Sequence, residues 1–177
     1  PNPDFGAVLR YFVRDGLESR KEIRRKAEQV IASEGGDKPY PSWDALRTED
    51  RELKPAVYLM IRDAQGRLIR QVTGKSGTGL HQTAWDLRLP APEPVSITSG
   101  GSRPYWMSDP VGPLVLPGKY SARLAIERDG VLTDTGASRS FTVKALPGSD
   151  EITTDRQALQ TFQLEVASLQ RAVRGSV

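Results

Sequence analysis

Hydrophobic and polar residues alternate along most of the chain between residues 56 and 145. This period of two predicts β-strands, because successive side chains of a strand point to opposite faces of a sheet. The clearest example is a strand over residues 57–62, a tight turn at 63–66 and a return strand over 67–73. Five further strands are expected at residues 6–14, 80–87, 119–128, 131–134 and 138–145. Seven short strands separated by Gly, Pro and Asp predict a mainly β chain that folds as an antiparallel β-sandwich.

The period changes to that of a helix near the start of the chain. Apolar residues recur with helical spacing at Ile23, Ala27, Val30 and Ile31, and a Gly-Gly pair follows at residues 35–36. Ser42 is a suitable N-cap for a second, short helix that ends near residue 51. We therefore expect a helical insertion over about residues 17–52, within a connection between strands that spans 17–54.

A third helix is predicted near the end of the chain. Residues 154–157 form a capping box, and the helix is expected over about 154–173. Its apolar residues follow the 3-4-3-4 spacing of a seam that packs on another helix: Leu159, Phe162, Val166, Leu169 and Val173. We expect this seam to dock on the helix around residues 23–31, and self-association through Leu159, Phe162, Val166 and Leu169 is the alternative. The chain is thus divided into a β-sandwich domain (1–148) and a helical extension (149–177).

The stretch from residue 88 to residue 117 is rich in proline and holds seven of the thirteen prolines of the chain. Proline lacks the backbone N–H and restricts φ, so neither a long helix nor an inner strand is expected there. Two aromatic residues of this stretch, Tyr105 and Trp106, form a candidate contact surface together with Tyr40 and Trp43.

Charge and composition argue against several classes of function. The net charge is only +3, and the basic residues of 20–26 are interleaved with glutamates at helical spacing, so we expect intrahelical ion pairs and no nucleic-acid partner. There is no Cys, and His81 is the only histidine, which leaves too few ligands for a zinc site. A general base would need a nucleophile and an orienting partner, and no motif supplies them. We expect no metal, no cofactor and no catalysis, with His81 bonding to a loop carbonyl.

Targeting signals are not visible in the sequence. No apolar stretch is long enough to cross a bilayer, and there is no signal peptide. The chain opens Pro1-Asn2-Pro3 without an initiator methionine. We expect it to be part of a longer protein.

Four short motifs follow one another in a recognisable order. They are Asp63-Ala64-Gln65-Gly66, Gly79-Leu80-His81, Trp85-Asp86-Leu87 and Pro117-Gly118-Lys119-Tyr120. This order resembles immunoglobulin-like domains of the flagellar-hook-capping type. The opening residues 2–7 and the segments 39–43 and 112–115 narrow the resemblance to the C-terminal region of bacterial sortilin-like or sialidase-type β-propeller proteins, the glycosyl hydrolase BNR repeat proteins.

The resemblance implies an immunoglobulin- or fibronectin-III-like fold and a secreted or periplasmic parent protein. It carries over no catalytic residue, because a propeller's active site would lie outside this chain. The implied role is a non-catalytic accessory domain that packs on or positions the upstream propeller. The alternative is a carbohydrate- or peptide-binding module that uses loop aromatics. The motif residues have structural roles in this interpretation: Gly66, Gly79, His81, Trp85, Asp86, Pro117, Gly118 and Tyr120.

Three of these motif residues have specific expected contacts. The Trp85 ring is expected on the buried face of its strand, where it supplies a large apolar area to a thin core. Asp86 is expected to face outward and accept backbone N–H groups from the proline-rich stretch. The Tyr120 ring is expected to be buried with its hydroxyl bonded to loop backbone, as in a tyrosine corner.

Overall fold

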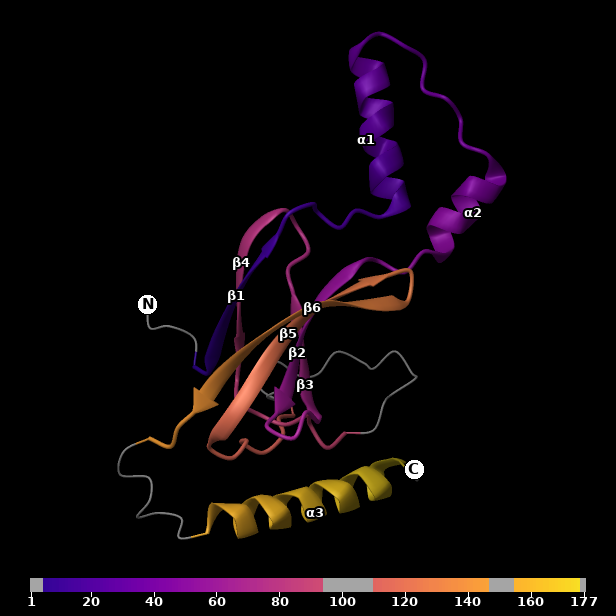
Figure 1. Ribbon diagram of the computed structural model, residues 1–177. Helices are drawn as coiled ribbons and strands as arrows, with labels where there is room; N and C mark the ends of the chain where they lie inside the picture. Colours follow the sequence, from indigo (N-terminus) through magenta and orange to yellow (C-terminus); the bar gives the residue numbers. More distant parts are fainter. Residues whose placement is uncertain (1–4, 94–109, 147–154, 176–177) are drawn as a thin grey trace.

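The computed structural model describes residues 5–93, 110–146 and 155–175. These residues form a mainly β structure with six strands in two antiparallel sheets and three helices (Figure 1). In chain order the elements are β1 (Ala7–Val13), α1 (Arg20–Ser33), α2 (Trp43–Arg51), β2 (Ala56–Asp63), β3 (Leu68–Gly74), β4 (Gly79–Trp85), β5 (Gly118–Arg128), β6 (Val131–Val143) and α3 (Arg156–Gly175).

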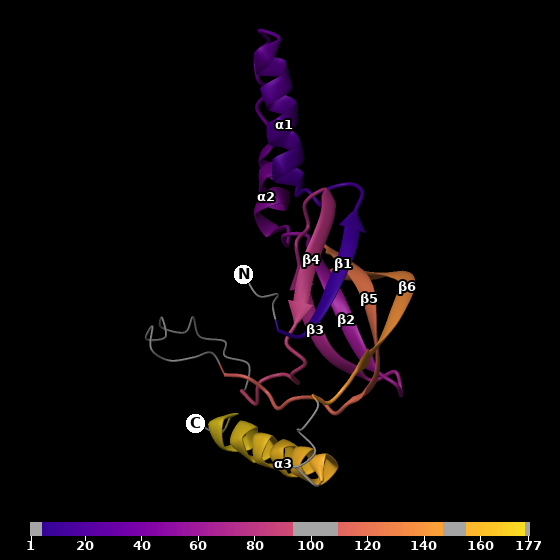
Figure 2. The same cartoon turned by 90° about the vertical axis from the view of Figure 1, so that its left-hand side faces the viewer.

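The strands are divided unequally between the two sheets. One sheet pairs β1 with β4, and the other has the order β3-β2-β5-β6 (Figure 2). All neighbouring strands are antiparallel. The chain passes from β4 in the small sheet to β5 in the middle of the large one.

The core lies between the two sheets and draws on alternate residues of their strands. Tyr11, Val13 and Trp85 come from the small sheet, and they pack with residues of β2 and β5 in one cluster. The buried members from the large sheet are Val57, Leu59, Ile61, Tyr120 and Ala122. Phe141 and Val143 of β6 are partly buried against the same cluster. The predicted alternation over residues 57–62 and 119–128 holds for the side that faces the small sheet, but Met60 and Ala125 on the other side are also buried.

Two turns of the large sheet follow directly from their sequences. In the β2–β3 turn, the Asp63 carboxylate accepts hydrogen bonds from the backbone N–H groups of Gln65 (3.0 Å) and Arg67 (2.9 Å). Gly66 of this turn has φ +78°. The β5–β6 hairpin turns through Asp129 (φ 50°) and Gly130 (φ 77°), the two positive φ values of a type I′ turn.

The prediction of two separate strands at residues 131–134 and 138–145 was wrong. The described residues contain one strand there, β6, so six strands are present instead of seven. The register shifts opposite Arg123–Ala125, where Gly136 has φ +78° and the Thr135 hydroxyl donates to the Leu124 carbonyl oxygen (2.8 Å). Residues 135–137 therefore form a bulge within a continuous strand and not a break between two strands.

The helical insertion is present, but its first helix begins later than predicted. Ser19 caps α1 in a capping box with Glu22, so the helix starts at Arg20 and not at Leu17. Leu17 is buried, and its backbone N–H donates to the Ser76 carbonyl oxygen (3.0 Å). Ser42 caps α2 as predicted, by accepting from the Ala45 backbone N–H (3.2 Å). Together α1 and α2 form a helical arm that projects from one end of the sheets (Figures 1 and 2).

The expected docking of the C-terminal helix on the helix around residues 23–31 was wrong. Helix α3 lies across the end of the sheets opposite to the helical arm, so α1 and α3 are separated by the length of the strands (Figures 1 and 2). The Asp155 carboxylate accepts from the Ala158 backbone N–H (2.8 Å) at the start of α3. Thr154, the first residue of the predicted capping box, lies outside the described residues.

Candidate functional site

The motif residues Trp85 and Tyr120 meet in the core. The Trp85 side chain is 1% exposed and packs edge-on against the Tyr120 ring, with ring centroids 5.6 Å apart. Phe141 of β6 also packs edge-on against Trp85 (6.2 Å) and stacks on Tyr120 (6.1 Å). The Trp85 indole N–H donates to the Arg88 carbonyl oxygen (3.1 Å), which satisfies the only polar group of the ring. This aromatic cluster links the small sheet to β5 and β6.

Tyr120 makes the backbone contact that was expected of it. Its hydroxyl donates to the Leu116 carbonyl oxygen (2.7 Å) across the corner formed by Pro117 and Gly118. Burial and the nearby Asp63 carboxylate raise the pKa of Tyr120, so the hydroxyl stays a donor. The Pro117-Gly118 corner is thereby tied to the first turn of β5.

His81 bonds to a loop carbonyl, as expected for a strand histidine. Its Nε2 lies 2.6 Å from the Gly77 carbonyl oxygen. Its ring lies against Tyr11, with centroids 5.5 Å apart, and the Tyr11 hydroxyl donates to the Lys75 carbonyl oxygen (3.0 Å). The two side chains hold the β3–β4 loop, which enters β4 through Gly79 with φ +118°.

Asp86 acts at the start of the proline-rich stretch. Its carboxylate accepts from the Arg88 backbone N–H (3.1 Å), next to Leu87 with φ 57°. Strand β4 therefore ends at Trp85, two residues earlier than predicted.

The two described ends of the proline-rich stretch run side by side. Leu89 N–H donates to the Pro113 carbonyl oxygen (2.9 Å), and Val115 N–H donates to that of Leu87 (2.8 Å). These bonds hold the start and the end of the stretch together beside β4 and β5.

Only two of the four residues of the candidate aromatic surface lie among the described residues. Tyr40 and Trp43 lie at the connection between α1 and α2 and are 76% and 70% exposed. Tyr105 and Trp106 lie outside the described residues, so the proposed grouping of all four rings stays a prediction.

Several charges of the helical arm are paired within the arm. Arg24 bonds to both carboxylate oxygens of Glu49 on α2 (2.6 and 2.8 Å) and to Glu28 one turn along α1 (2.5 Å). The bonds to Glu49 and Glu28 raise the pKa of Arg24, and the bonds from Arg24 lower that of Glu49. The predicted intrahelical pairing is present, and the strongest contact of the arm runs between its two helices.

The apolar stripe of the arm, in contrast, is not covered by the described residues. Neither α1 nor α2 contains a buried residue, and Ile23 and Val30 are each more than half exposed. The sequence predicted that the C-terminal helix would dock on this part of α1. The position of the stripe on a projecting arm leaves it open.

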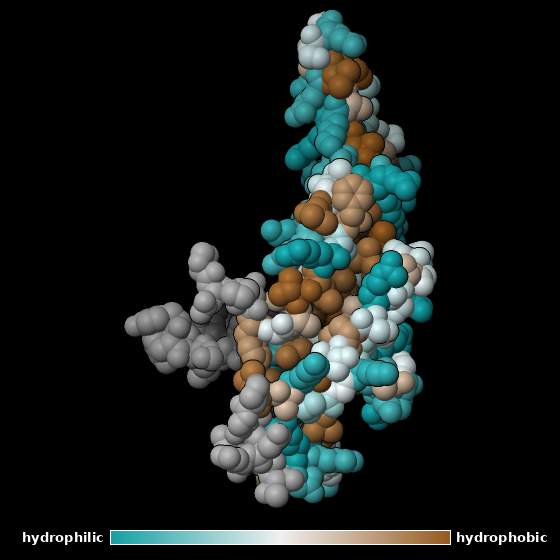
Figure 3. All heavy atoms as spheres, turned by 60° about the vertical axis from the view of Figure 1, so that its left-hand side comes forward, coloured by the Kyte–Doolittle hydropathy of each residue, from teal (hydrophilic) through white to brown (hydrophobic). Residues whose placement is uncertain are grey.

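A second exposed apolar surface lies on the outer face of the small sheet. Phe12 pairs with Leu80 and Val8 with Ala84, on the face opposite to Tyr11 and Trp85. Phe12, Leu80 and Val8 are exposed. Figure 3 shows hydrophobic residues (brown) running from the helical arm onto this face. We call Val8, Phe12, Leu80, Ile23 and Val30 the apolar face.

The sequence analysis did not predict this surface. The pattern that indicates it is the presence of large apolar residues on both faces of β1 and β4, whereas a strand with one solvated face has apolar residues on one face only.

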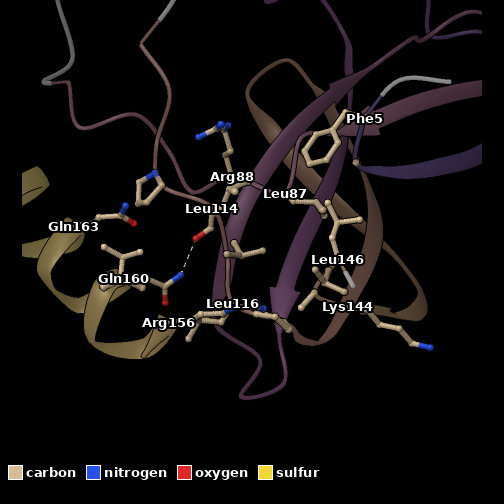
Figure 4. A pocket seen from close by; sticks show the side chains of 17 residues that line it. Phe5, Leu87, Arg88, Leu114, Leu116, Lys144, Leu146, Arg156, Gln160 and Gln163 are labelled. Carbon is tan, nitrogen blue, oxygen red and sulfur yellow. Dashed lines mark hydrogen bonds between the residues drawn. The ribbon is translucent and has the colours of Figure 1, made fainter. Parts of the chain in front are cut away.

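A cavity of about 620 Å³ lies between α3 and the end of the sheets. Its lining is mainly apolar, with Phe5, Leu87 and Leu146 on the side away from α3 and Leu114 and Leu116 next to the helix (Figure 4). The Gln160 amide donates to the Leu114 carbonyl oxygen (3.0 Å) and connects the helix to the opposite wall. Helix α3 is thus held mainly by polar contacts, and the cavity lies between the helix and the sheets.

Among the described residues, no group of three or more His, Cys, Asp or Glu side chains is placed to hold a metal ion. None of the helices in the described ranges is long and apolar enough to cross a membrane. No family model, curated protein or solved structure matches the chain.

Proposed function

We propose that this chain is a non-catalytic accessory module that docks on another domain of a larger secreted protein through the apolar face. The main support for this proposal is the exposure of this face, which extends from α1 onto the outer side of the β1–β4 sheet. Contiguous apolar surface of this kind marks interaction sites, because soluble monomers rarely expose it.

The fold that we propose is an immunoglobulin-like β-sandwich. Two observations support this assignment: the two antiparallel sheets share one core, and Tyr120 bonds to the backbone four residues upstream. A tyrosine contact of this kind recurs in immunoglobulin-like sandwiches. Strands β1 and β4 would form the smaller layer, and their outer face is then the natural docking side.

The helical arm fits a docking role because it is internally braced. The bidentate contact between Arg24 and Glu49 joins the two helices, and Arg20 N–H donates to the Glu52 carboxylate (2.7 Å) where the arm meets the sheets. A braced arm holds Ile23 and Val30 in place before a partner arrives, which lowers the entropy cost of binding.

The partner that we propose is an upstream β-propeller of the same polypeptide, in a secreted or periplasmic protein. This part of the proposal is supported by the motif order from Asp63 to Tyr120. The chemistry would lie in the propeller, and the module would position or stabilise it.

The test is binding between this chain and the remaining part of its reading frame, produced separately. We expect measurable affinity by calorimetry and a loss of about 10-fold or more for the Phe12→Ser/Leu80→Ser variant, since each ring or side chain buried at an interface contributes on the order of 1 kcal/mol or more. Leu132→Ser, an exposed position at the far edge of the large sheet, is the matched control and should bind like wild type. Absence of binding, together with independent melting of the two parts in the joined protein, would count against the proposal.

A second candidate is a carbohydrate- or peptide-binding module that uses Tyr40 and Trp43. The exposure of both rings favours it, because exposed aromatic rings stack on sugars and peptides. Glycan-array binding that disappears in a folded Trp43→Ala variant would support this function, and a blank array would argue against it.

A further inference from the structure

The side of α3 that faces the sheets is polar. Gln160 donates to the Leu114 carbonyl oxygen (3.0 Å), and Arg174 forms an ion pair with Glu93 (3.1 Å). Ala167 is the only buried residue of α3. These three residues are seven positions apart, which is two helical turns, so they lie on one stripe along the helix.

The apolar seam of α3 is displaced from this stripe and is exposed. It consists of Leu159, Phe162, Val166 and Leu169, and we call these four residues the α3 seam. Phe162 is 62% exposed and Leu169 is 66% exposed. Leu159, Phe162 and Val166 border the crevices between the helix and the rest of the chain and are partly covered there. The hydrogen bond and the ion pair of the helix are thus made by its polar stripe, and a large part of the apolar seam stays exposed.

The spacing of the α3 seam fits a second helix. A helix that covers a sheet usually needs a stripe of three or four apolar residues per seven, whereas this seam has two per seven, the pattern of knobs-into-holes pairing. The helices α1 and α2 lie at the other end of the sheets (Figures 1 and 2), so neither supplies the partner within one molecule.

The residues that flank the α3 seam favour an identical partner. Charged residues at these positions normally select a different chain or repel a copy of the same one. Here the flanking residues are Ala158, Gln163, Glu165, Gln170 and Ala172, with a single charge among them. Two copies of the seam can therefore approach each other without a row of like charges.

We propose that α3 pairs with α3 of a second copy of this chain, in an antiparallel arrangement. An antiparallel pair opposes the two helix dipoles, which is favourable, whereas a parallel pair would align them. This surface is separate from the apolar face, which lies on the helical arm and on the outer side of the β1–β4 sheet.

The pairing is weak and reversible. A helix of 20 residues is about 30 Å long. Four side chains from each helix cover less area than a standard stable interface of roughly 1,600 Å². The dimer is therefore expected in about the micromolar range of dissociation constants.

Sedimentation of the whole chain over a range of micromolar concentrations tests the proposal. The mass of the wild type should rise toward that of a dimer, and Phe162→Gln/Leu169→Gln should weaken dimerisation by about 10-fold or more. Leu164→Gln is the matched control, because Leu164 is an exposed leucine of the same helix outside the seam, and it should dimerise like wild type. Equal helicity by circular dichroism shows that the variants fold. A wild type that stays monomeric, or a double variant that dimerises normally, overturns the proposal.

Disulfide cross-linking tests the orientation, since the chain has no cysteine of its own. Val166 lies near the middle of α3, so an antiparallel pair places it within about one turn of its counterpart, while two copies of Leu159 are about 20 Å apart. Val166→Cys should cross-link under mild oxidation, and Leu159→Cys should not. Efficient cross-linking of Leu159→Cys would overturn the antiparallel arrangement.

Discussion

The Tyr120 hydroxyl donates a 2.7 Å hydrogen bond to the carbonyl oxygen of Leu116, four residues before it in the chain. The bond closes the corner at which the proline-rich connection turns into β5. On its other side the same ring packs against Trp85 and Phe141. One side chain thus joins the path of a connection to the packing of the core between the two sheets.

Removing only this hydroxyl should destabilise the fold measurably. In Tyr120→Phe the ring stays and the Leu116 carbonyl loses its partner, so we expect a loss of about 1–2 kcal/mol in the free energy of unfolding, measured by urea denaturation. Tyr40→Phe removes a hydroxyl from an exposed ring and should change the same quantity by less than about 0.5 kcal/mol. Equal stability of both variants would show that the corner is held without the bond.

Trp85 should be the largest single contributor to the core. It is almost fully buried and touches residues of both sheets, so Trp85→Ala leaves a large cavity and should cost about 3–5 kcal/mol. That is a large share of a typical domain stability of about 5–15 kcal/mol, so we expect a largely unfolded variant. The control is Trp43→Ala, which removes an exposed indole from α2 and should melt within a few degrees of wild type. A Trp85→Ala protein as stable as the control would show that the indole is not a core anchor.

The strands were predictable because their alternation has a direct physical cause. The residues 57–62 and 119–128 must bury one side of each strand, and the structure buries Val57, Ile61 and Tyr120. The local turn and cap signals at Gly66, Gly130 and Ser42 were also sufficient, since they depend on bonds within a few residues. The bulge at Gly136 was predicted to be a break between strands, because a glycine two residues after an aspartate indicates a turn as readily as an irregularity inside a strand.

The surroundings of the helices could not be predicted from the same kind of pattern. The spacing of Ile23 and Val30 identifies the apolar side of α1, but it does not say what covers that side. The spacing in α3 likewise predicted helix packing, and the wrong partner was assigned because the position of α3 depends on polar contacts such as Gln160 with Leu114. A contact between two residues that lie far apart along the chain produces no periodic pattern in the sequence.

The charge on Asp63 should make the stability of the large sheet depend on acid pH. Burial raises the pKa of Asp63, but hydrogen bonds from the Arg67 side chain and from the backbone of Arg67 and Gln65 outweigh it, so the pKa lies below its ordinary value of 3.8. A depressed pKa in the folded state contributes stability above 3.8 that is lost as the pH falls through the lower, folded value.

Asp63→Asn should remove this part of the pH dependence. We expect lower stability than wild type at pH 7 and a shallower decrease in the urea midpoint between about pH 5 and pH 2. Asp50→Asn, on the exposed side of α2, should keep the wild-type slope. Parallel curves for wild type and Asp63→Asn would contradict the role of the Arg67 contact.

Gly6 should tolerate no side chain, because it combines an unusual backbone conformation with a close approach to β4. Its φ is +120°, and a Cβ atom there would lie 1.9 Å from the Trp85 carbonyl oxygen. Gly6→Ala must therefore adopt strained backbone and push β1 away from β4 at the point where Ala7 pairs with Trp85, for which we expect a loss of roughly 3–5 kcal/mol.

Two glycines separate these contributions. Gly35 has φ +78° and open space around it, so Gly35→Ala should show the backbone cost alone, about 1 kcal/mol. Gly77 has open space and no positive φ, so Gly77→Ala should be close to neutral in chemical denaturation. If Gly6→Ala were no more destabilising than Gly35→Ala, the approach of β1 to the Trp85 carbonyl would have to be looser than the structure shows, and the two-stranded sheet that presents Phe12 and Leu80 would be less firmly placed against the core.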